Sequence, residues 1–213
     1  MISQQTNHTW CKICGITSVD DTVACAALGV DAVGFNCYEQ SSRYVELAQL
    51  VDLAASIDVT RVALFVDADR ANVEAVLAAA QIDLLQFHGG ESPDFCASFG
   101  LPYIKVLRMQ SGTDVPAMAI AYASAWALLL DTFVPGRPGG TGQQFDWSLW
   151  PKDCKSRLIL AGGLDPENVA GAVAQLSPFG VDVCGGVEGR QKGQKDLHKV
   201  SQFIKEVSSV SGR

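Results

Sequence analysis

The sequence predicts an α/β protein built as a single (β/α)8 barrel of the TIM, phosphate-binding type. Short apolar runs alternate with longer, alanine-rich amphipathic runs, which is the pattern of parallel strands covered by helices. An internal echo recurs at multiples of about 25 residues, the length of one βα unit. Glycine clusters follow the last three apolar runs, where a barrel of this type commonly binds a phosphate.

Eight apolar runs are predicted strands, and most show so little alternation that both of their faces should be buried. They are Cys11–Cys14, Ala32–Cys37, Arg61–Val66, Leu84–His88, Tyr103–Leu107, Trp126–Asp131, Leu158–Ala161 and Val181–Cys184. Eight βα units fill about 200 residues, close to the 213 of the chain. An open doubly wound sheet is the alternative, but no G-x-G-x-x-G follows the first strand and no G-x-x-x-x-G-K-[ST] occurs.

Amphipathic segments between these strands are predicted helices. They are Val19–Leu28, Leu47–Ser56, Ala71–Ala80, Ser92–Phe99, Asp114–Ala123, Pro166–Leu176 and Asp196–Val207, with a truncated helix at Asp146–Trp150. Ser18, followed three residues later by Asp21, is a capping signature for the first helix. Pro166 after Asp165 is expected in the first turn of its helix.

The internal echo is the sequence around Asp31, which resembles the one around Asp83 and, more briefly, the one around Asp182. These aspartates stand where strands are expected to start. We therefore expect them at the bottom of the barrel, in structural roles, because function in this fold resides at the opposite end.

The bulk composition suits one domain, with residues 1–10 as a polar tail and 11–213 as the barrel. A net charge of −7 argues against general binding to nucleic acid or an anionic membrane. No apolar run reaches about 18 residues, and the first ten residues do not read as a secretory signal. Seven cysteines, several inside apolar runs, favour free thiols in a cytoplasmic protein.

Two residues at opposite strand ends suggest acid–base chemistry. Asp131 directly follows an apolar run, so partial burial would favour its protonated form and let it act as an acid. Cys14 ends the first strand, across the barrel, and could serve as the base. Lys12 shares its face of the strand. It either favours the Cys14 thiolate or pairs with a carboxylate inside the barrel.

Three further groups at strand ends are candidates for binding. Arg43 could hold a carboxylate in bidentate fashion, or be a solvated loop residue. His88 could be a ligand, a base or a pocket wall; it has no partner at metal spacing, which favours the wall. Glycine lets the backbone approach an anion, so we expect the late clusters to bind phosphate. The residues concerned are Gly140, Gly142, Gly162, Gly163, Gly185 and Gly186.

Seven motifs, in order along nearly the whole chain, carry a resemblance to a known family. They are KICGIT, GFNCYEQSSRYV, QFHGGE, LLLDT, GGTGQQFDW, LAGGLDPENV and GVDVCGGVEGRQKGQKD. The set resembles phosphoribosylanthranilate isomerase, an enzyme of tryptophan biosynthesis.

This resemblance implies an Amadori rearrangement of N-(5-phosphoribosyl)anthranilate that needs no cofactor or metal. It implies Asp131 as the general acid that opens the sugar ring, Cys14 as the general base at C2′, and Arg43 as the carboxylate ligand. The glycine clusters would hold the phosphate, with Lys12 and His88 in the substrate pocket. A cytoplasmic monomer or homodimer, with a small molecule as its partner, is expected.

The chain departs from the family pattern at two places. Ser42 stands where the family usually has proline, and Cys184-Gly185-Gly186 replaces the usual Ser-Ser-Gly. Because serine hydroxyls near the phosphate site are missing, we expect a change in the affinity for phosphate and not in the type of reaction.

The competing interpretations are of three kinds. One is a different phosphosugar-processing barrel enzyme, although the tail is short for a related synthase and histidines are few for a metal-dependent epimerase. Another is a redox or zinc module on Cys11 and Cys14, although no second ligand pair follows and residues three apart on a strand face opposite ways. The last is an inactive barrel with a binding role.

Overall fold

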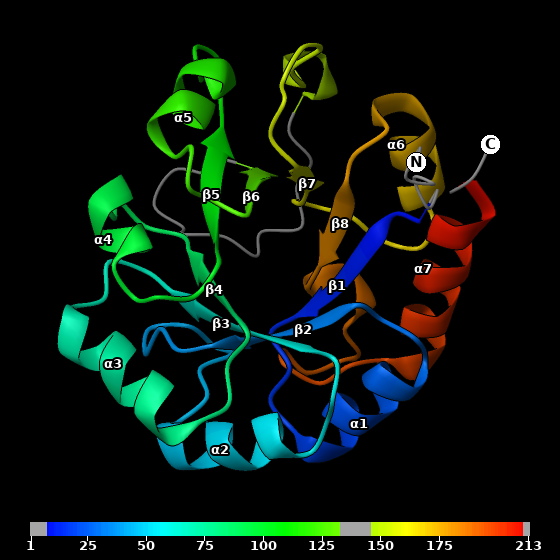
Figure 1. Ribbon diagram of the computed structural model, residues 1–213. Coiled ribbons are helices and arrows are strands. Elements are labelled where there is room, and N and C mark those ends of the chain that lie inside the picture. Colours follow the sequence, from blue (N-terminus) through cyan, green and yellow to red (C-terminus); the bar gives the residue numbers. More distant parts are fainter. Residues whose placement is uncertain (1–7, 133–145, 211–213) are drawn as a thin grey trace, which may run out of the picture.

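The computed structural model describes residues 8–132 and 146–210. In this part of the chain, eight parallel strands form a closed barrel in sequence order, and β1 pairs with β8. Figure 1 shows the helices around the outside of the strands. The strands are β1 Trp10–Cys14, β2 Ala32–Asn36, β3 Thr60–Phe65, β4 Leu84–Phe87, β5 Tyr103–Met109, β6 Ala127–Thr132, β7 Leu158–Leu160 and β8 Gly180–Val183. The predicted barrel is confirmed.

The helices follow the strands along the chain. They are α1 Val19–Ala27, α2 Leu47–Ala55, α3 Arg70–Ala79, α4 Pro93–Ala97, α5 Val115–Ala121, α6 Val169–Leu176 and α7 Leu197–Val210, with 3₁₀ turns η1 Trp147–Leu149 and η2 Gly185–Val187. The expected truncated helix is thus the single turn η1. Ser18 caps α1 by accepting a hydrogen bond from the Asp21 backbone N–H at 3.2 Å, as predicted. None of these helices is long and apolar enough to cross a membrane, as far as the described residues go.

The prediction for Pro166 was wrong. Helix α6 begins only at Val169, and Pro166 lies in the turn before it. The Asp165 carboxylate accepts hydrogen bonds from the backbone N–H groups of Glu167 and Asn168. These bonds are of the kind that an aspartate makes at a helix start or in a turn, and here they hold the turn that precedes α6.

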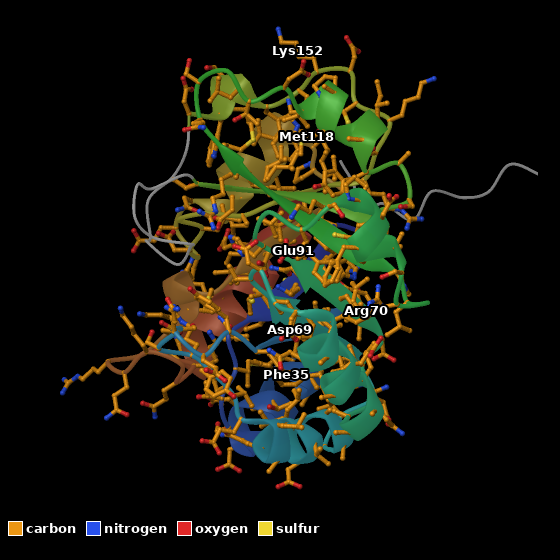
Figure 2. All side chains as sticks on the ribbon, turned by 90° about the vertical axis from the view of Figure 1, so that its left-hand side faces the viewer. Phe35, Asp69, Arg70, Glu91, Met118 and Lys152 are labelled. Carbon is orange, nitrogen blue, oxygen red and sulfur yellow. The ribbon has the colours of Figure 1, made fainter. Side chains whose placement is uncertain are left out.

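Packing occurs in two layers because side chains alternate along each strand. One core lies between strands and helices, and Cys11, at 3% exposure, belongs to it. A smaller core fills the barrel interior with apolar side chains such as Ile104 and Leu129, closed off by Trp10, Trp126 and Phe179. Figure 2 shows side chains between the strands and helices, and Lys152 at one end of the molecule.

The three echo aspartates do not share one role. Asp31 precedes β2 and accepts a hydrogen bond from the Cys11 N–H, and Asp83 precedes β4 and accepts one from the Arg61 N–H. Both are structural, as expected. Asp182, however, is the third residue of β8, pairs in register with Lys12, and lines a cavity at the barrel mouth. The expectation for Asp182 was wrong because β2 and β4 begin one residue after their aspartates, whereas β8 begins two residues before its own.

Candidate active site

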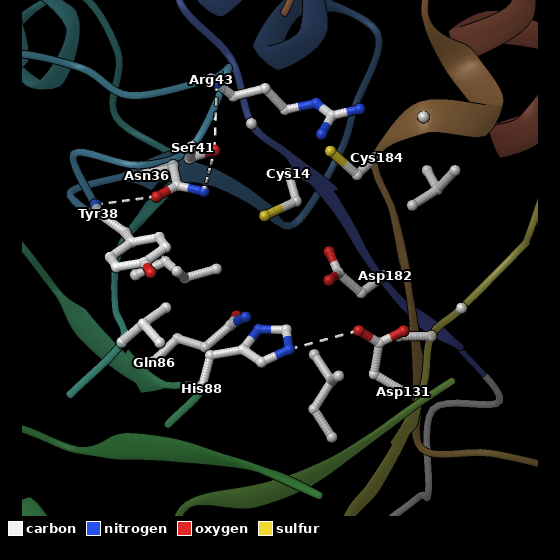
Figure 3. A pocket seen from close by; sticks show the side chains of 18 of the residues that line it. Cys14, Asn36, Tyr38, Ser41, Arg43, Gln86, His88, Asp131, Asp182 and Cys184 are labelled. Carbon is white, nitrogen blue, oxygen red and sulfur yellow. Dashed lines mark hydrogen bonds and ion pairs between the residues drawn. The ribbon is translucent and has the colours of Figure 1, made fainter. Parts of the chain in front are cut away.

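A cavity of about 410 Å³ opens at the carboxyl ends of the strands. Many of the predicted site residues line it: Cys14, Arg43, His88, Asp131, Gly162, Gly163, Gly185 and Gly186. Gly140 and Gly142 lie outside the described residues. Figure 3 shows Cys14 with Cys184 toward one side of the cavity and His88 with Asp131 toward the other. The structure therefore brings together the groups that were separate in sequence.

Cys14 and Cys11 do not form a common site. Cys14 is 6% exposed at the cavity, whereas Cys11 packs beneath the helices on the opposite face of β1. The hydrogen bond with Cys184 and burial raise the pKa of the Cys14 thiol well above its ordinary value, and together they outweigh the opposite effect of Lys12. The pKa of Cys11 is also raised, mainly by burial. A thiol with a raised pKa resists oxidation and metal binding.

Lys12 is fully buried beneath the cavity. Its Nζ donates a hydrogen bond to Asp182 Oδ1 at 2.8 Å across the β1–β8 seam. Burial alone would lower the pKa of Lys12, but the Asp182 carboxylate raises it above the ordinary value. Lys12 therefore pairs with a carboxylate, and it also acts to lower the pKa of Cys14, although burial and Cys184 outweigh that effect.

Arg43 is fixed in place by a carboxylate of the protein itself. Its Nε and one terminal nitrogen donate to the two oxygens of Glu188 at 2.6 and 2.8 Å. Arg43 is only 9% exposed, so it is not a solvated loop residue. A guanidinium has five N–H donors, so the edge that does not face Glu188 can still bind a second carboxylate.

Asp131, at the end of β6, is 8% exposed and lies at the cavity. Its Oδ1 accepts a hydrogen bond from the Thr132 backbone N–H at 2.8 Å. Its Oδ2 lies 3.4 Å from His88 Nε2. His88 is thus more than a wall of the pocket, because it contacts the carboxyl group that was predicted to act as the acid.

The glycines after β7 and β8 bring backbone close to the cavity. Gly162 and Gly163 have φ of 84° and 65°, a left-handed conformation that favours glycine. A Cβ on Gly162 would clash with Thr132 and approach Asp131 Oδ1 at 2.9 Å, and one on Gly186 would clash with the Leu164 carbonyl. Backbone therefore lines this side of the cavity where side chains would otherwise stand, a geometry suited to an anion.

Sequence reasoning missed three residues of the site. Asp182 was placed at the barrel bottom, Glu188 was not singled out, and Cys184 was noted only as a departure. The alternation of β8 could have revealed Asp182, since Val181 and Val183 face away from it on the strand. Glu188 carried no such signal, because its partner Arg43 is 145 residues away.

Cys184 is expected to be the most readily alkylated thiol of the site. The hydrogen bond with Cys14 and the nearby Lys195 and Arg43 cations lower its pKa to about 7. Because the thiolate is the reactive form, the rate of modification by iodoacetamide should reach half its maximum near pH 7. Peptide mass mapping would measure this, with Cys37 as the control, since burial raises the pKa of Cys37 to about 12. A Cys184 that reacts only above pH 9 would contradict the prediction.

Fold and site together define a (β/α)8 barrel with a thiol, a carboxyl group and glycine-rich backbone at one mouth. The family model of N-(5′phosphoribosyl)anthranilate (PRA) isomerase matches residues 11–206. The chain belongs to this family.

Known proteins support this membership along nearly the full length. The chain is 50% identical over 201 residues to N-(5′-phosphoribosyl)anthranilate isomerase of Azotobacter vinelandii, covering 93% of this chain and 97% of the relative. A crystal structure of phosphoribosyl anthranilate isomerase from Thermotoga maritima matches with a TM-score of 0.85 and 34% identity, over 94% of this chain and 99% of that one. Another such isomerase, solved in complex with reduced 1-(o-carboxyphenylamino)-1-deoxyribulose 5-phosphate, matches with a TM-score of 0.82 and 33% identity, over 94% and 99%.

Proposed function

We propose that this chain catalyses the Amadori rearrangement of N-(5′-phosphoribosyl)anthranilate to 1-(2-carboxyphenylamino)-1-deoxyribulose 5-phosphate in tryptophan biosynthesis. The observation that carries this function, within the isomerase family, is that Cys14 and Asp131 line one cavity. The reaction needs a proton donor at one atom of the sugar and a base at another, which suits two groups on separate strands.

In this scheme, Asp131 protonates the furanose ring oxygen and the ring opens to a Schiff base. Cys14, as the thiolate, then removes the proton from C2′, and the resulting enolamine tautomerises to the ketone. Net charge and redox state are unchanged, because one proton enters and one leaves. The raised pKa of Cys14 makes its thiolate a strong base once it forms, but makes that form scarce at neutral pH.

Different residues would bind the carboxylate and the phosphate of the substrate. Arg43 would hold the anthranilate carboxylate through the donors that Glu188 leaves available. Gly162, Gly163, Gly185 and Gly186 would hold the phosphate, with Gly140 and Gly142 as further candidates outside the described residues. Lys12 supports the pocket from below through Asp182.

Three wider proposals accompany this function. Residues 11–213 are the catalytic domain and 1–10 its tail, with β1 beginning one residue earlier, at Trp10. The protein acts in the cytoplasm on a small molecule and without nucleic acid. It is a monomer or a homodimer; a relative from Thermotoga maritima has been described as dimeric.

The proposed reaction is tested by following the fluorescence of N-(5′-phosphoribosyl)anthranilate in the presence of the purified chain. We expect the fluorescence to fall as the aminoketose forms, and mass-neutral conversion to be seen by chromatography. The double variant Cys14→Ala/Asp131→Asn, purified in the same way, is the blank that detects an isomerase carried over from the host. Equal rates with the wild type and the double variant would exclude the proposal.

Glu188→Gln should weaken substrate binding more than turnover. The change removes the charge that fixes Arg43, and a hydrogen bond to a charged group contributes about 1.5–3 kcal/mol. We expect KM to rise by about tenfold or more, with kcat within about threefold of the wild type. Glu39→Gln, an exposed acid in the same loop as Arg43, is the control. An unchanged KM in Glu188→Gln would argue against a binding role for Arg43.

A further inference from the structure

The contact between His88 and Asp131 has no role in the scheme above. His88 Nε2 lies 3.4 Å from Asp131 Oδ2, and the two side chains are 9% and 11% exposed. The residues come from different strand ends, His88 directly after β4 and Asp131 within β6. Figure 3 shows the imidazole directed at the carboxyl group across the cavity.

The contact is close but incomplete as a hydrogen bond. His88 Nε2 is buried and has no hydrogen-bond partner of good geometry among the described residues. A buried nitrogen without a partner costs free energy. Hydrogen bonds between catalytic groups are often long before substrate binds and shorten in the complex. A small movement of Asp131 Oδ2 would complete this one.

The chemistry of Asp131 requires a source for its proton. Its Oδ1 accepts the Thr132 N–H at 2.8 Å, and a carboxyl group that acts as a general acid must hold a proton at the start of each turnover. An imidazole changes its charge between about pH 5 and 8. A histidine beside the carboxylate can therefore keep one proton within the pair at neutral pH.

We propose that His88 and Asp131 share one proton and act together as the general acid, with His88 as a positioning residue that acts through Asp131. This inference rests on the proposed function. As the substrate ring opens, the shared proton passes by way of Asp131 Oδ2 to the ring oxygen, and the bond between that oxygen and C1′ breaks. A neutral imidazole remains and regains its proton from solvent after turnover.

Among the charged groups of the described residues near His88, Asp131 is the one that contacts its imidazole. Charged or titratable groups that line this cavity or the one beside it include Cys14, Asp182, Asp67, Lys105 and Arg108. The Asp67 carboxylate accepts a hydrogen bond from the Gly90 N–H. Lys12 is paired with Asp182 at 2.8 Å, and Lys105 with Glu91 at 2.8 Å. Arg108 donates to the His88 backbone carbonyl and so contacts its main chain.

The kinetic test compares His88→Gln with His88→Ala across pH. The glutamine Nε2 can donate a hydrogen bond to Asp131, as the imidazole is proposed to do, but it has no proton that titrates near neutral pH. We expect His88→Gln to keep KM within about threefold and to lose kcat by at least about tenfold at pH 7.5. We also expect the alkaline limb of its kcat/KM profile to lie at least about one pH unit lower than in the wild type, and His88→Ala to show the same displacement. An alkaline limb at the wild-type pH in His88→Gln would overturn the proposal.

A second measurement does not depend on turnover. The chain has three histidines, so ¹⁵N-histidine NMR resolves His88 by comparison with His88→Gln. We expect the His88 ring to stay protonated to higher pH in the wild type than in Asp131→Asn, because the carboxylate stabilises the imidazolium. Identical titrations in the two proteins would overturn the pairing. If the wild type fails to isomerise substrate, the proposed function fails, and the NMR comparison still reports whether the pair shares a proton.

Discussion

Cys14→Ala is expected to lower kcat/KM by about 10²–10⁴-fold, the range in which general acid–base groups contribute. The Cys14 side chain lines the cavity, and in the proposed scheme Arg43 and the glycines hold the substrate charges. Removing it should therefore reduce kcat and leave KM within about threefold. Steady-state fluorescence kinetics at several pH values would separate the two parameters.

Cys11→Ala is the matched control for this change. Cys11 lies on the same strand, and its side chain is also buried, but it packs beneath the helices and not at the cavity. We expect its kcat/KM to stay within about threefold of the wild type, with a small loss of stability from the smaller side chain. Equal losses of activity in the two variants would mean that damage to β1, and not removal of a base, explains the Cys14 result.

Lys12→Met is expected to lower the free energy of unfolding by about 3–5 kcal/mol. The change leaves Asp182, at 9% exposure, as a buried charge without its cation, and breaking a buried pair in this way typically costs that much. Urea denaturation followed by circular dichroism would measure the loss. All variants should be measured at the same pH near 7.

Two variants calibrate that loss. Glu74→Gln breaks the exposed Arg70–Glu74 pair, at 49% and 58% exposure, and should cost no more than about 0.5 kcal/mol. Lys12→Met/Asp182→Asn removes both charges and should recover part of the stability, because no buried charge is left unpaired. A Lys12→Met protein within about 1 kcal/mol of the wild type would show that the pair is not a main source of stability.

The fold could be predicted because most strand residues are apolar and several helices carry a local cap signature. Ser18 shows this well, since its cap depends on residues within one turn. Predictions failed where local patterns compete. Pro166 and Asp165 together suit a helix start or a turn, and only the packing of α6 decides between them. The echo at Asp182 failed because similarity over four residues does not determine where a strand begins.

The site could be predicted only as far as strand order dictates. A closed barrel gathers the carboxyl ends of its strands, so Cys14, His88 and Asp131 were expected at one mouth before any distance was known. Contacts between side chains were not accessible in this way. The Arg43–Glu188 pair and the Lys12–Asp182 pair join residues 145 and 170 positions apart, and nothing in the residues near either partner indicates the other.

The seam between β1 and β8 bears on how the chain folds. The strand made first must pair with the strand made last, and Lys12 acquires its counter-charge only when residue 182 arrives. Contacts of such long separation slow folding. During synthesis, β1 therefore has one edge open and a lysine that must stay hydrated until β8 emerges. We expect barrel closure to be the late step of folding, and the open β1 edge to be the place where an incomplete chain associates with another.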